Sequence, residues 1–227
     1  MNYDIGKNIE DVMQAHFECD ALHVQGQKYT HRDLYTRADM LRHVVNQVVD
    51  KSNQFIGIFC YRSVDAYAGL LGALFSKNAY LPINPALPAD KITKMLSISD
   101  CNTVILGEEA AGVFAKIISS VSALTVICPN PGKKINELSA SNSRHTFIFP
   151  EEFPNKSVKK DIISKDAPAY LMFTSGSTGD PKGIVVSHKN LFTYARYIIE
   201  EFEFSSEDRI SQAPDISFDL SIQDLFS

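Results

Sequence analysis

The 227-residue chain contains no tryptophan, only four cysteines and no long apolar run, and each shortage excludes a class of protein. The longest apolar run, from Ala66 to Phe75, has about half the length of a membrane-spanning helix. The N-terminus lacks the basic segment followed by an apolar stretch that marks a secretory signal. We therefore predict a cytoplasmic protein. The cysteines are widely separated and lack Cys-x-x-Cys or histidine partners, so we expect neither disulfides nor a structural metal, and mostly buried thiols, at Cys19, Cys60, Cys101 and Cys128.

The chain also lacks a strong excess of one charge. Its net charge is −5 at pH 7, and acidic and basic residues are interleaved, so no basic patch of the kind that binds nucleic acid is present. An apolar content of 44% with 22% charged residues is typical of an ordinary globular protein, and the length fits one or two domains.

The apolar pattern predicts a layered α/β fold. The first fifty residues indicate a helix near 8–19, a hairpin turning at Gly26-Gln27 and a helix over 31–49, with Thr30 as N-cap and Asp33 completing a capping box. After them, short apolar strands alternate with helices, which is typical of a mostly parallel sheet covered by helices on both faces. We predict strands near 55–60, 79–83, 102–106, 123–128, 145–149, 169–174, 183–187 and 209–212, and helices near 64–77, 88–98, 109–120 and 188–201.

We accordingly divide the chain, 1–227, into a helix-hairpin-helix lead-in of about 1–52 and an α/β sheet subdomain of about 53–227. The proline-rich region 129–168 is the least regular, and we interpret it as a surface excursion between strands.

One ten-residue segment, 174–183, carries most of the chemical information. It reads Thr-Ser-Gly-Ser-Thr-Gly-Asp-Pro-Lys-Gly and lies between two apolar strands. Glycines let successive backbone N–H groups turn toward one point, while hydroxyls and a lysine add further donors, so the segment suits a polyphosphate. Ligands of such sheets bind beyond the carboxyl ends of the strands, where this segment begins.

Two other nucleotide motifs do not fit the segment. The P-loop requires Gly-Lys followed by Ser or Thr and then a helix, whereas Lys182 is followed by Gly183 and a strand. The loop glycines also do not have the Gly-x-Gly-x-x-Gly spacing of dinucleotide sites. A plain surface hairpin is the structural alternative, but ten residues exceed the two to five that usually connect hairpin strands.

The pattern Tyr-x-x-x-Thr-Ser-Gly-Ser-Thr-Gly-x-Pro-Lys-Gly resembles the signature of AMP-forming adenylating enzymes, a family that includes acyl-CoA synthetases, luciferases and peptide-synthetase adenylation domains. The resemblance implies that the loop holds the β- and γ-phosphates of ATP while a carboxylate attacks the α-phosphate. It places the phosphate contacts at Thr174, Ser175, Gly176, Ser177, Thr178, Gly179 and Lys182.

The similarity extends over nearly the whole chain. Tyr29-Thr30-x-x-Asp-Leu34, Arg62-Ser63 and Ala79-Tyr80-Leu81-Pro82-Ile83-Asn84-Pro85 occur in the family in this order and at similar spacing. Two positions differ from the family pattern: Phe75-Ser76-Lys77 replaces Lys-Ala-Gly, and Asn84 replaces Asp. We interpret both as scaffold positions, with Asn78 taking a left-handed helix cap in place of glycine.

A second motif, Ser217-Phe218-Asp219-Leu220-Ser221, lies near the C-terminus. Its structural interpretation is a helix start, with Ser217 as N-cap and Asp219 in the first turn. Its functional interpretation rests on resemblance: Phe-Asp-x-Ser after the phosphate loop is similar to the branch that activates amino acids, in which the aspartate holds the α-ammonium. Leu220 and Gln223 would then line the side-chain end of the pocket.

Together the motifs resemble D-alanine–carrier-protein ligases most, with peptide-synthetase adenylation domains next. The resemblance implies ATP-dependent formation of aminoacyl-AMP with pyrophosphate release, followed by transfer to the phosphopantetheine thiol of a carrier protein. ATP, an amino acid and the carrier would be the partners, without nucleic acid or membrane. His188 receives no catalytic role, because a carboxylate is already ionised and adenylation needs no base.

Several parts that the family resemblance implies are not found in this chain. They are the adenine-binding segment with its Mg²⁺-binding glutamate, the ribose-binding aspartate and the C-terminal catalytic domain with its lysine, so we expect no complete set of catalytic residues and no metal ligand here. We predict that the 227-residue chain alone forms no measurable adenylate. The alternative is that the chain is a non-catalytic nucleotide-binding or interaction module, or a degenerate remnant of an adenylating enzyme.

Overall fold

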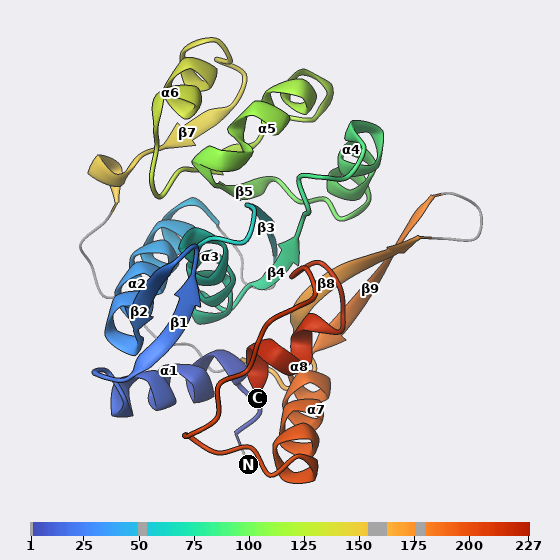
Figure 1. Cartoon of the computed structure of the whole chain (residues 1–227). Helices are drawn as coiled ribbons and strands as arrows, with labels where there is room; N and C mark the ends of the chain where they lie inside the picture. The colour runs from blue at the N-terminus through green and yellow to red at the C-terminus, as the bar shows by residue number, and fades with distance from the viewer. Residues whose placement is uncertain (1, 50–53, 154–162, 176–179) are drawn as a thin grey trace.

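The computed structural model describes residues 2–49, 54–153, 163–175 and 180–227. Its main sheet has seven strands in the order β7-β6-β5-β3-β4-β8-β9 (Figure 1). All neighbouring strands are parallel except β8 and β9, which are antiparallel. The strands are β3 (Phe55–Phe59), β4 (Ala79–Pro82), β5 (Thr103–Leu106), β6 (Thr125–Ile127), β7 (Thr146–Ile148), β8 (Pro168–Ser175) and β9 (Pro181–Ser187).

Helices cover both faces of this sheet, as the sequence predicts. The bounds are α1 (Ile5–Ala15), α2 (His31–Val48), α3 (Val64–Phe75), α4 (Ala89–Ile98), α5 (Ala111–Ile117), α6 (Lys133–Ala140), α7 (His188–Glu201) and α8 (Ser221–Phe226), with 3₁₀ turns η1 (Glu108–Ala110), η2 (Ile118–Ser120) and η3 (Pro150–Glu152). Side chains of α4, α5 and α6 form one core cluster, and side chains of α1, α2, α3, α7 and α8 belong to the other. Successive strand residues point to opposite faces of the sheet and so belong to different clusters. In β5, Ile105 belongs to the cluster that contains α2 and α3, whereas Val104 and Leu106 belong to the cluster that contains α4, α5 and α6.

Local sequence signals account for most of these elements. A hairpin of β1 (Asp20–Val24) and β2 (Gln27–Thr30) precedes α2. At the start of α2 the Thr30 hydroxyl accepts the Asp33 N–H at 3.1 Å, and the Asp33 carboxylate accepts the Thr30 N–H at 2.9 Å, which confirms the capping box. Every residue of helix α3 is buried, between α2 and the sheet, and the helix is accordingly apolar on all sides apart from Asp65, whose carboxylate accepts hydrogen bonds from the Asn130 amide.

Three local predictions are wrong. The strand near 209–212 is absent, and that stretch is irregular. Region 129–168 contains a helix, α6, whose first turn is capped from a distance: the Glu108 carboxylate accepts N–H groups of Gly132 at 2.9 Å and Lys134 at 3.0 Å. The left-handed residue after α3 is Lys77 (φ 64°), not Asn78.

The two departures from the family pattern have structural explanations. Lys77 occupies the position where the family has glycine, and its ammonium pairs with the carboxylate of Asp4. The Asn78 amide instead donates to the Ser76 carbonyl at 3.0 Å and accepts the Gln54 N–H at 3.0 Å. Asn84 accepts the Ala86 N–H at 2.8 Å in a turn that aspartate could form equally well.

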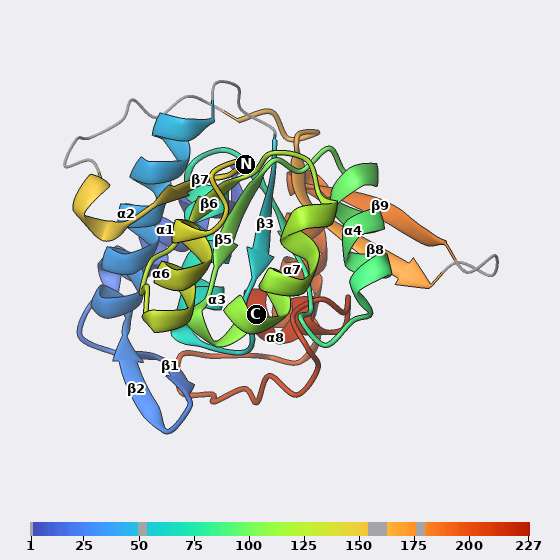
Figure 2. The same ribbon diagram turned by 90° about the horizontal axis from the view of Figure 1, so that it is seen from above.

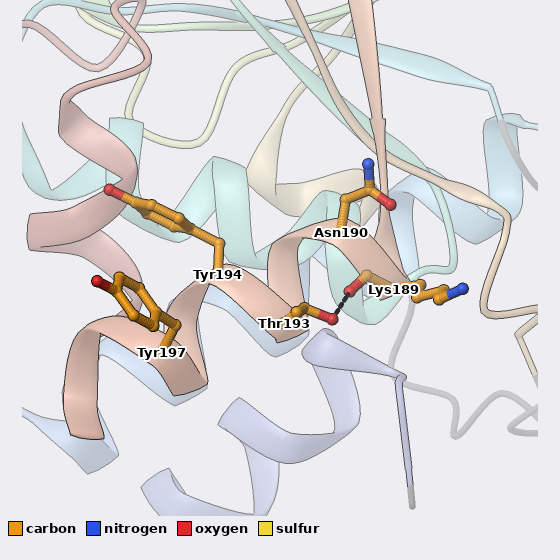
Figure 3. A pocket seen from close by; sticks show the side chains of 5 residues that line it. All are labelled: Lys189, Asn190, Thr193, Tyr194 and Tyr197. Atoms are coloured by element: carbon orange, nitrogen blue, oxygen red, sulfur yellow. Dashed lines mark hydrogen bonds between the residues drawn. The ribbon is translucent and has the colours of Figure 1, made fainter. Parts of the chain in front are cut away.

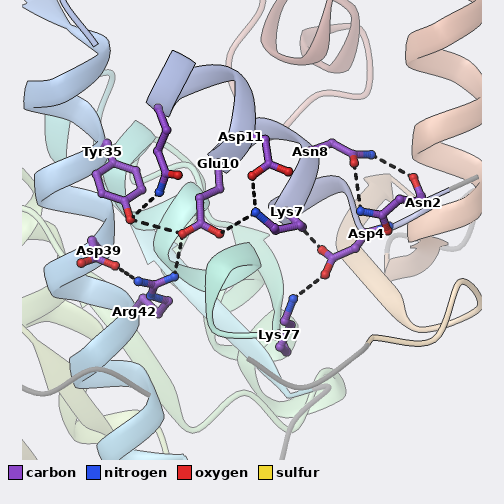
Figure 4. A network of polar contacts seen from close by, with 11 residues as sticks. Asn2, Asp4, Lys7, Asn8, Glu10, Asp11, Tyr35, Asp39, Arg42 and Lys77 are labelled. Atoms are coloured by element: carbon purple, nitrogen blue, oxygen red, sulfur yellow. Dashed lines mark hydrogen bonds and ion pairs between the residues drawn. The ribbon is translucent and has the colours of Figure 1, made fainter. Parts of the chain in front are cut away.

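A polar network fixes α1 against α2 and α3 (Figure 4). Its centre is Glu10, whose side chain is only 4% exposed. The Glu10 carboxylate accepts hydrogen bonds from Arg42 Nη1 at 3.1 Å and from the Tyr35 hydroxyl at 3.2 Å. Arg42 also pairs with Asp39. A buried charge of this kind is tolerated only because these partners replace the water it has lost.

Three of the four cysteines are buried and free, as predicted, whereas Cys19 is exposed. Burial raises the pKa of Cys101 and of Cys128 to about 12, so both thiols stay protonated at neutral pH. Among the described residues no helix is both long and apolar enough to cross a membrane.

His188 begins α7 and is completely buried. Its Nδ1 accepts the N–H of Ile5 at 3.2 Å, so the imidazole joins the start of α1 to the start of α7. Burial lowers the pKa of His188. The hydrogen bond therefore gives His188 a structural role between the two helix starts.

The buried imidazole predicts a pH-dependent stability. Because its pKa is lower in the folded than in the unfolded chain, the unfolded state binds more protons below about pH 6.5, and the free energy of unfolding falls as the pH falls. Urea unfolding can be followed by circular dichroism at pH 7.5 and pH 5.5. Between these two pH values the free energy of unfolding should fall less in His188→Asn than in the unmodified chain. His23→Asn, at an exposed position of β1, should leave the loss unchanged; equal losses in all three proteins would contradict the prediction.

Candidate functional site

Thr174, Ser175 and residues 181–183 lie at the far end of the long antiparallel pair β8–β9, a hairpin that projects from the sheet (Figure 1). Thr174 pairs with Lys182 and Ser175 with Pro181, so five of the ten residues of segment 174–183 belong to the two strands. The connection is therefore short enough for an ordinary hairpin, and the inference that the segment is too long for one is wrong. The described part of the chain does not include Gly176, Ser177, Thr178, Gly179 or the side chain of Ser175.

The described residues of the hairpin present polar groups to solvent. Thr174 and Lys182 are exposed and directly opposite each other, and the Thr174 hydroxyl lies 3.5 Å from the Lys182 carbonyl oxygen. Gly183 serves packing: a Cβ atom there would approach Leu171 Cδ1 to 2.9 Å and Phe173 Cε1 to 3.3 Å. Any larger residue at Gly183 would therefore push these side chains away from the strand just below the tip.

Helix α4 holds the hairpin from one side. Lys94 Nζ lies 2.6 Å from the Asp180 carboxylate, with both side chains largely exposed. The hydrogen bond between them raises the pKa of Lys94 and lowers the pKa of Asp180. Nothing in the sequence indicates this pair, because its members are far apart along the chain.

The segment between α7 and α8 runs across the end of the sheet toward which β3 points, as Figure 2 shows. Near its end the Asp215 carboxylate accepts the Ser217 N–H at 3.0 Å and the Ser217 hydroxyl at 2.6 Å. Helix α8 begins only at Ser221. The interpretation of Ser217 as N-cap with Asp219 in the first turn is therefore wrong, and Asp219 lies in the turn that precedes the helix.

The turn that holds Asp219 leads into α8, whose Phe226 ring lies 6.4 Å from the ring of Tyr80, the residue against which Tyr170 of β8 packs. Tyr170 of β8 is 7% exposed, and its pKa is raised to about 12, mainly by burial and next by the negative charge of Asp219. Tyr194 of α7 acts on Tyr170 in the same direction. The Tyr170 ring packs against Tyr80 of β4 at a centroid distance of 5.4 Å. Tyr170 is the tyrosine of the signature, so its position was visible in the sequence, whereas no pattern indicated Tyr194.

The other two predicted pocket residues lie on either side of the start of α8. Leu220 is 72% exposed, and Gln223 is half-buried one turn into the helix. The structure thus brings Asp219, Leu220 and Gln223 together on one short stretch beside β8. Thr174 and Lys182 lie further along the same strand and on its partner.

An open depression lies along the outer side of α7 (Figure 3). It is lined by Lys189, Asn190, Thr193, Tyr194 and Tyr197. All five come from one helix, so the depression does not enclose a ligand in the way that binding pockets do. Within the described ranges, no three histidine, cysteine or acidic side chains lie close enough together to hold a metal ion.

Comparisons with known proteins relate this arrangement to a large group. A family model described as "AMP-binding enzyme" matches residues 9–227. Dimodular nonribosomal peptide synthase of Bacillus subtilis (strain 168) is 30% identical over 209 residues, which cover 92% of this chain and 8% of the relative. Gramicidin S synthase 2 of Brevibacillus brevis is 27% identical over 203 residues, covering 89% of this chain and 4% of the relative.

Solved structures share the same fold. The Vibrio cholerae adenylation domain AlmE, in complex with glycyl-adenosine-5'-phosphate, superimposes with a TM-score of 0.86 at 25% identity, covering all of this chain and 43% of AlmE. ATP-bound MatB from Rhodopseudomonas palustris superimposes with a TM-score of 0.75 at 20% identity, covering all of this chain and 44% of MatB. The chain thus spans less than half the length of these proteins and a small part of the curated relatives.

Proposed function

Because the chain belongs to the AMP-binding enzyme family, we propose that it supplies the phosphate-binding and amino-acid-binding elements of a domain that adenylates an amino acid. In this reaction an oxygen of the substrate carboxylate forms a bond to the α-phosphorus of ATP. The bond between the α-phosphorus and the bridging oxygen breaks, and pyrophosphate leaves. The aminoacyl group would then pass from AMP to the phosphopantetheine thiol of a carrier protein.

The observation that carries this proposal is the position of Asp219 relative to the hairpin. The charge of Asp219 raises the pKa of Tyr170, whose ring packs on Tyr80 together with Phe226 of α8, and Thr174 lies four residues further along β8. Four strand residues span about 13 Å, a length that suits a ligand with an ammonium group at one end and phosphates at the other. Asp219 would hold the ammonium, with Leu220 and Gln223 beside the substrate side chain.

The hairpin would hold the phosphates that leave. We assign this contact to Thr174, Ser175, Gly176, Ser177, Thr178, Gly179 and Lys182, which combine hydroxyl, backbone N–H and ammonium donors. Charge that develops on the departing pyrophosphate is stabilised by donors already in place, which is the largest contribution in many enzymes of this kind. Mg²⁺ would neutralise part of the same charge, and we expect its ligand outside this chain.

The relatives support an amino acid and a carrier as partners, because both curated relatives above are named as peptide or gramicidin synthases. The proposed reaction takes place in the cytoplasm. We also propose that the chain is divided into a lead-in of about 1–52 and a sheet subdomain of about 53–227. Among these proteins we propose a D-alanine ligase-like domain, with a peptide-synthetase module as the alternative, and pyrophosphate exchange with several amino acids, including D-alanine, identifies the substrate.

ATP–pyrophosphate exchange tests the role of the hairpin. We expect the natural polypeptide that contains this chain to catalyse exchange with at least one amino acid, and Lys182→Met to lower kcat by about 100-fold or more, as loss of one preorganised donor does elsewhere. Lys116→Met, at an exposed lysine of α5, is the matched control and should retain full activity. The 227-residue chain alone should show no exchange.

Three outcomes would count against the proposal. Equal kcat values for Lys182→Met and Lys116→Met would remove the hairpin from the reaction. ATP binding by the natural polypeptide without exchange for any amino acid would favour the non-catalytic nucleotide-binding module. Robust exchange by the 227-residue chain would show that the additional parts of the relatives are not needed.

A further inference from the structure

We propose that Gln212, held by Tyr67 and Arg62, is the positioning residue that sets the location of Asp219. The inference rests on the proposed function, because it explains how the substrate-binding aspartate is kept in place. Between α7 and α8 the described chain, which includes Asp219, forms no helix or strand as it crosses the end of the sheet (Figure 2). Interactions other than those of a helix or strand must therefore fix the position of Asp219.

Gln212 makes the first attachment, through both its side chain and its backbone. The Tyr67 hydroxyl donates to Gln212 Oε1 at 2.6 Å, and Arg62 Nη1 donates to the Gln212 carbonyl oxygen at 2.7 Å. The Gln212 amide nitrogen in turn donates to the Pro214 carbonyl. Tyr67 belongs to the fully buried helix α3, so the attachment point is among the most rigid parts of the fold.

A continuous series of turns links this attachment to Asp219. Next to the Asp215–Ser217 turn, the N–H of Phe218 donates to the Asp215 carbonyl at 3.0 Å. Between them Ile216 inserts its side chain into the core, with 4% exposed. The segment from Gln212 to Phe218 therefore behaves as one unit, and a shift of Gln212 would be transmitted toward Asp219.

The second attachment lies immediately after Asp219. Ser221 is completely buried, and its hydroxyl donates to the Phe218 carbonyl at 2.6 Å. Asp219 itself and its neighbours Phe218 and Leu220 are exposed. Since these three side chains have no packing of their own to hold them, the position of the Asp219 carboxylate depends on the attachments at Gln212 and Ser221.

The Gln212 attachment is the one that can be removed without opening the core. Gln212→Leu removes the amide, and Tyr67→Phe removes the hydroxyl that it accepts, while both keep most of the side-chain volume. In the natural polypeptide, each variant should raise the KM for the amino acid in pyrophosphate exchange by about five- to tenfold, the size expected for one lost hydrogen bond. The KM for ATP should stay within about twofold, because the hairpin is attached elsewhere.

Three further variants separate positioning from a general loss of structure. The double variant should raise the KM no further than Gln212→Leu alone, since Gln212→Leu already removes the contact that Tyr67→Phe removes. Gln212→Glu keeps an acceptor for the Tyr67 hydroxyl but loses the amide that donates to the Pro214 carbonyl, so it should recover only part of the difference in amino-acid KM between Gln212→Leu and the unmodified protein. Tyr61→Phe is the matched control, because Tyr61 is exposed and makes no hydrogen bond within the described residues.

The results divide as follows. An unchanged amino-acid KM in Gln212→Leu and Tyr67→Phe, with amino-acid-dependent exchange intact in the unmodified protein, overturns this inference alone. An equal rise in the KM for ATP, or a multiplied effect in the double variant, also overturns it. If the unmodified polypeptide shows no exchange with any amino acid, the proposed function fails and takes this inference with it.

Discussion

Asp219→Ala is expected to lower kcat/KM for the amino acid by about 30-fold to about 3,000-fold, because the bound substrate would cover the carboxylate, which is exposed in this chain, and form an enclosed charge pair with it. The substrate ammonium would enter the site and lose its hydration without gaining a counter-charge. The phosphate contacts lie on the hairpin, so the KM for ATP should change little. Asp219→Asn keeps the shape and should lose nearly as much, because it is the charge that matters.

Asp224→Ala provides the matched control for this prediction. Asp224 is an acidic residue of α8, five positions after Asp219, and no hydrogen bond or ion pair of its side chain occurs among the described residues. We expect its kcat/KM to stay within about threefold of the unmodified value. If Asp219→Ala behaves like Asp224→Ala in the exchange assay, Asp219 does not bind the substrate ammonium.

Arg42→Leu is expected to lower the free energy of unfolding by about 3 to 5 kcal/mol, the cost of breaking a buried ion pair by removing one partner. Glu10 would keep its contacts with the Tyr35 hydroxyl and with Lys7, but it would lose the cation that is best placed to balance its buried charge. Urea unfolding followed by circular dichroism measures the change, since the chain has no tryptophan for fluorescence.

The control for this prediction breaks an exposed pair. Arg196 and Glu200 are one turn apart on α7, with side chains 49% and 65% exposed. Arg196→Leu should change stability little, because solvent-exposed pairs contribute little to folding. If Arg42→Leu and Arg196→Leu lower the free energy of unfolding by similar amounts, the burial of Glu10 does not increase the contribution of its ion pair with Arg42 to stability.

Much of the fold could be predicted because local signals agreed with the tertiary structure. The capping box at Thr30 and the apolar strands of the sheet are local features, and the structure confirms them. Helix α6 was missed because its cap comes from Glu108, a residue that only the folded chain brings to its N-terminus. The predicted strand near 209–212 failed because Ile210 remains exposed and no neighbouring strand pairs with it.

The candidate site was predictable in its parts but not in its arrangement. Residue types indicated segment 174–183 as a phosphate-binding element, and the family resemblance alone pointed to Asp219. The closeness of Asp219 to Tyr170, the Lys94–Asp180 pair and the attachment of Gln212 to Tyr67 all join residues far apart in sequence. Such contacts depend on the order of strands in the sheet, which no local pattern encodes.

The central claim is that the hairpin and Asp219 together serve a substrate that carries both a carboxylate and an ammonium group. It is tested most directly by pyrophosphate exchange in the natural polypeptide with amino acids, including D-alanine, each paired with the matched carboxylic acid that lacks the amino group. We predict exchange with at least one amino acid and background exchange with its amine-free counterpart. Equal exchange with both members of each pair would contradict the claim.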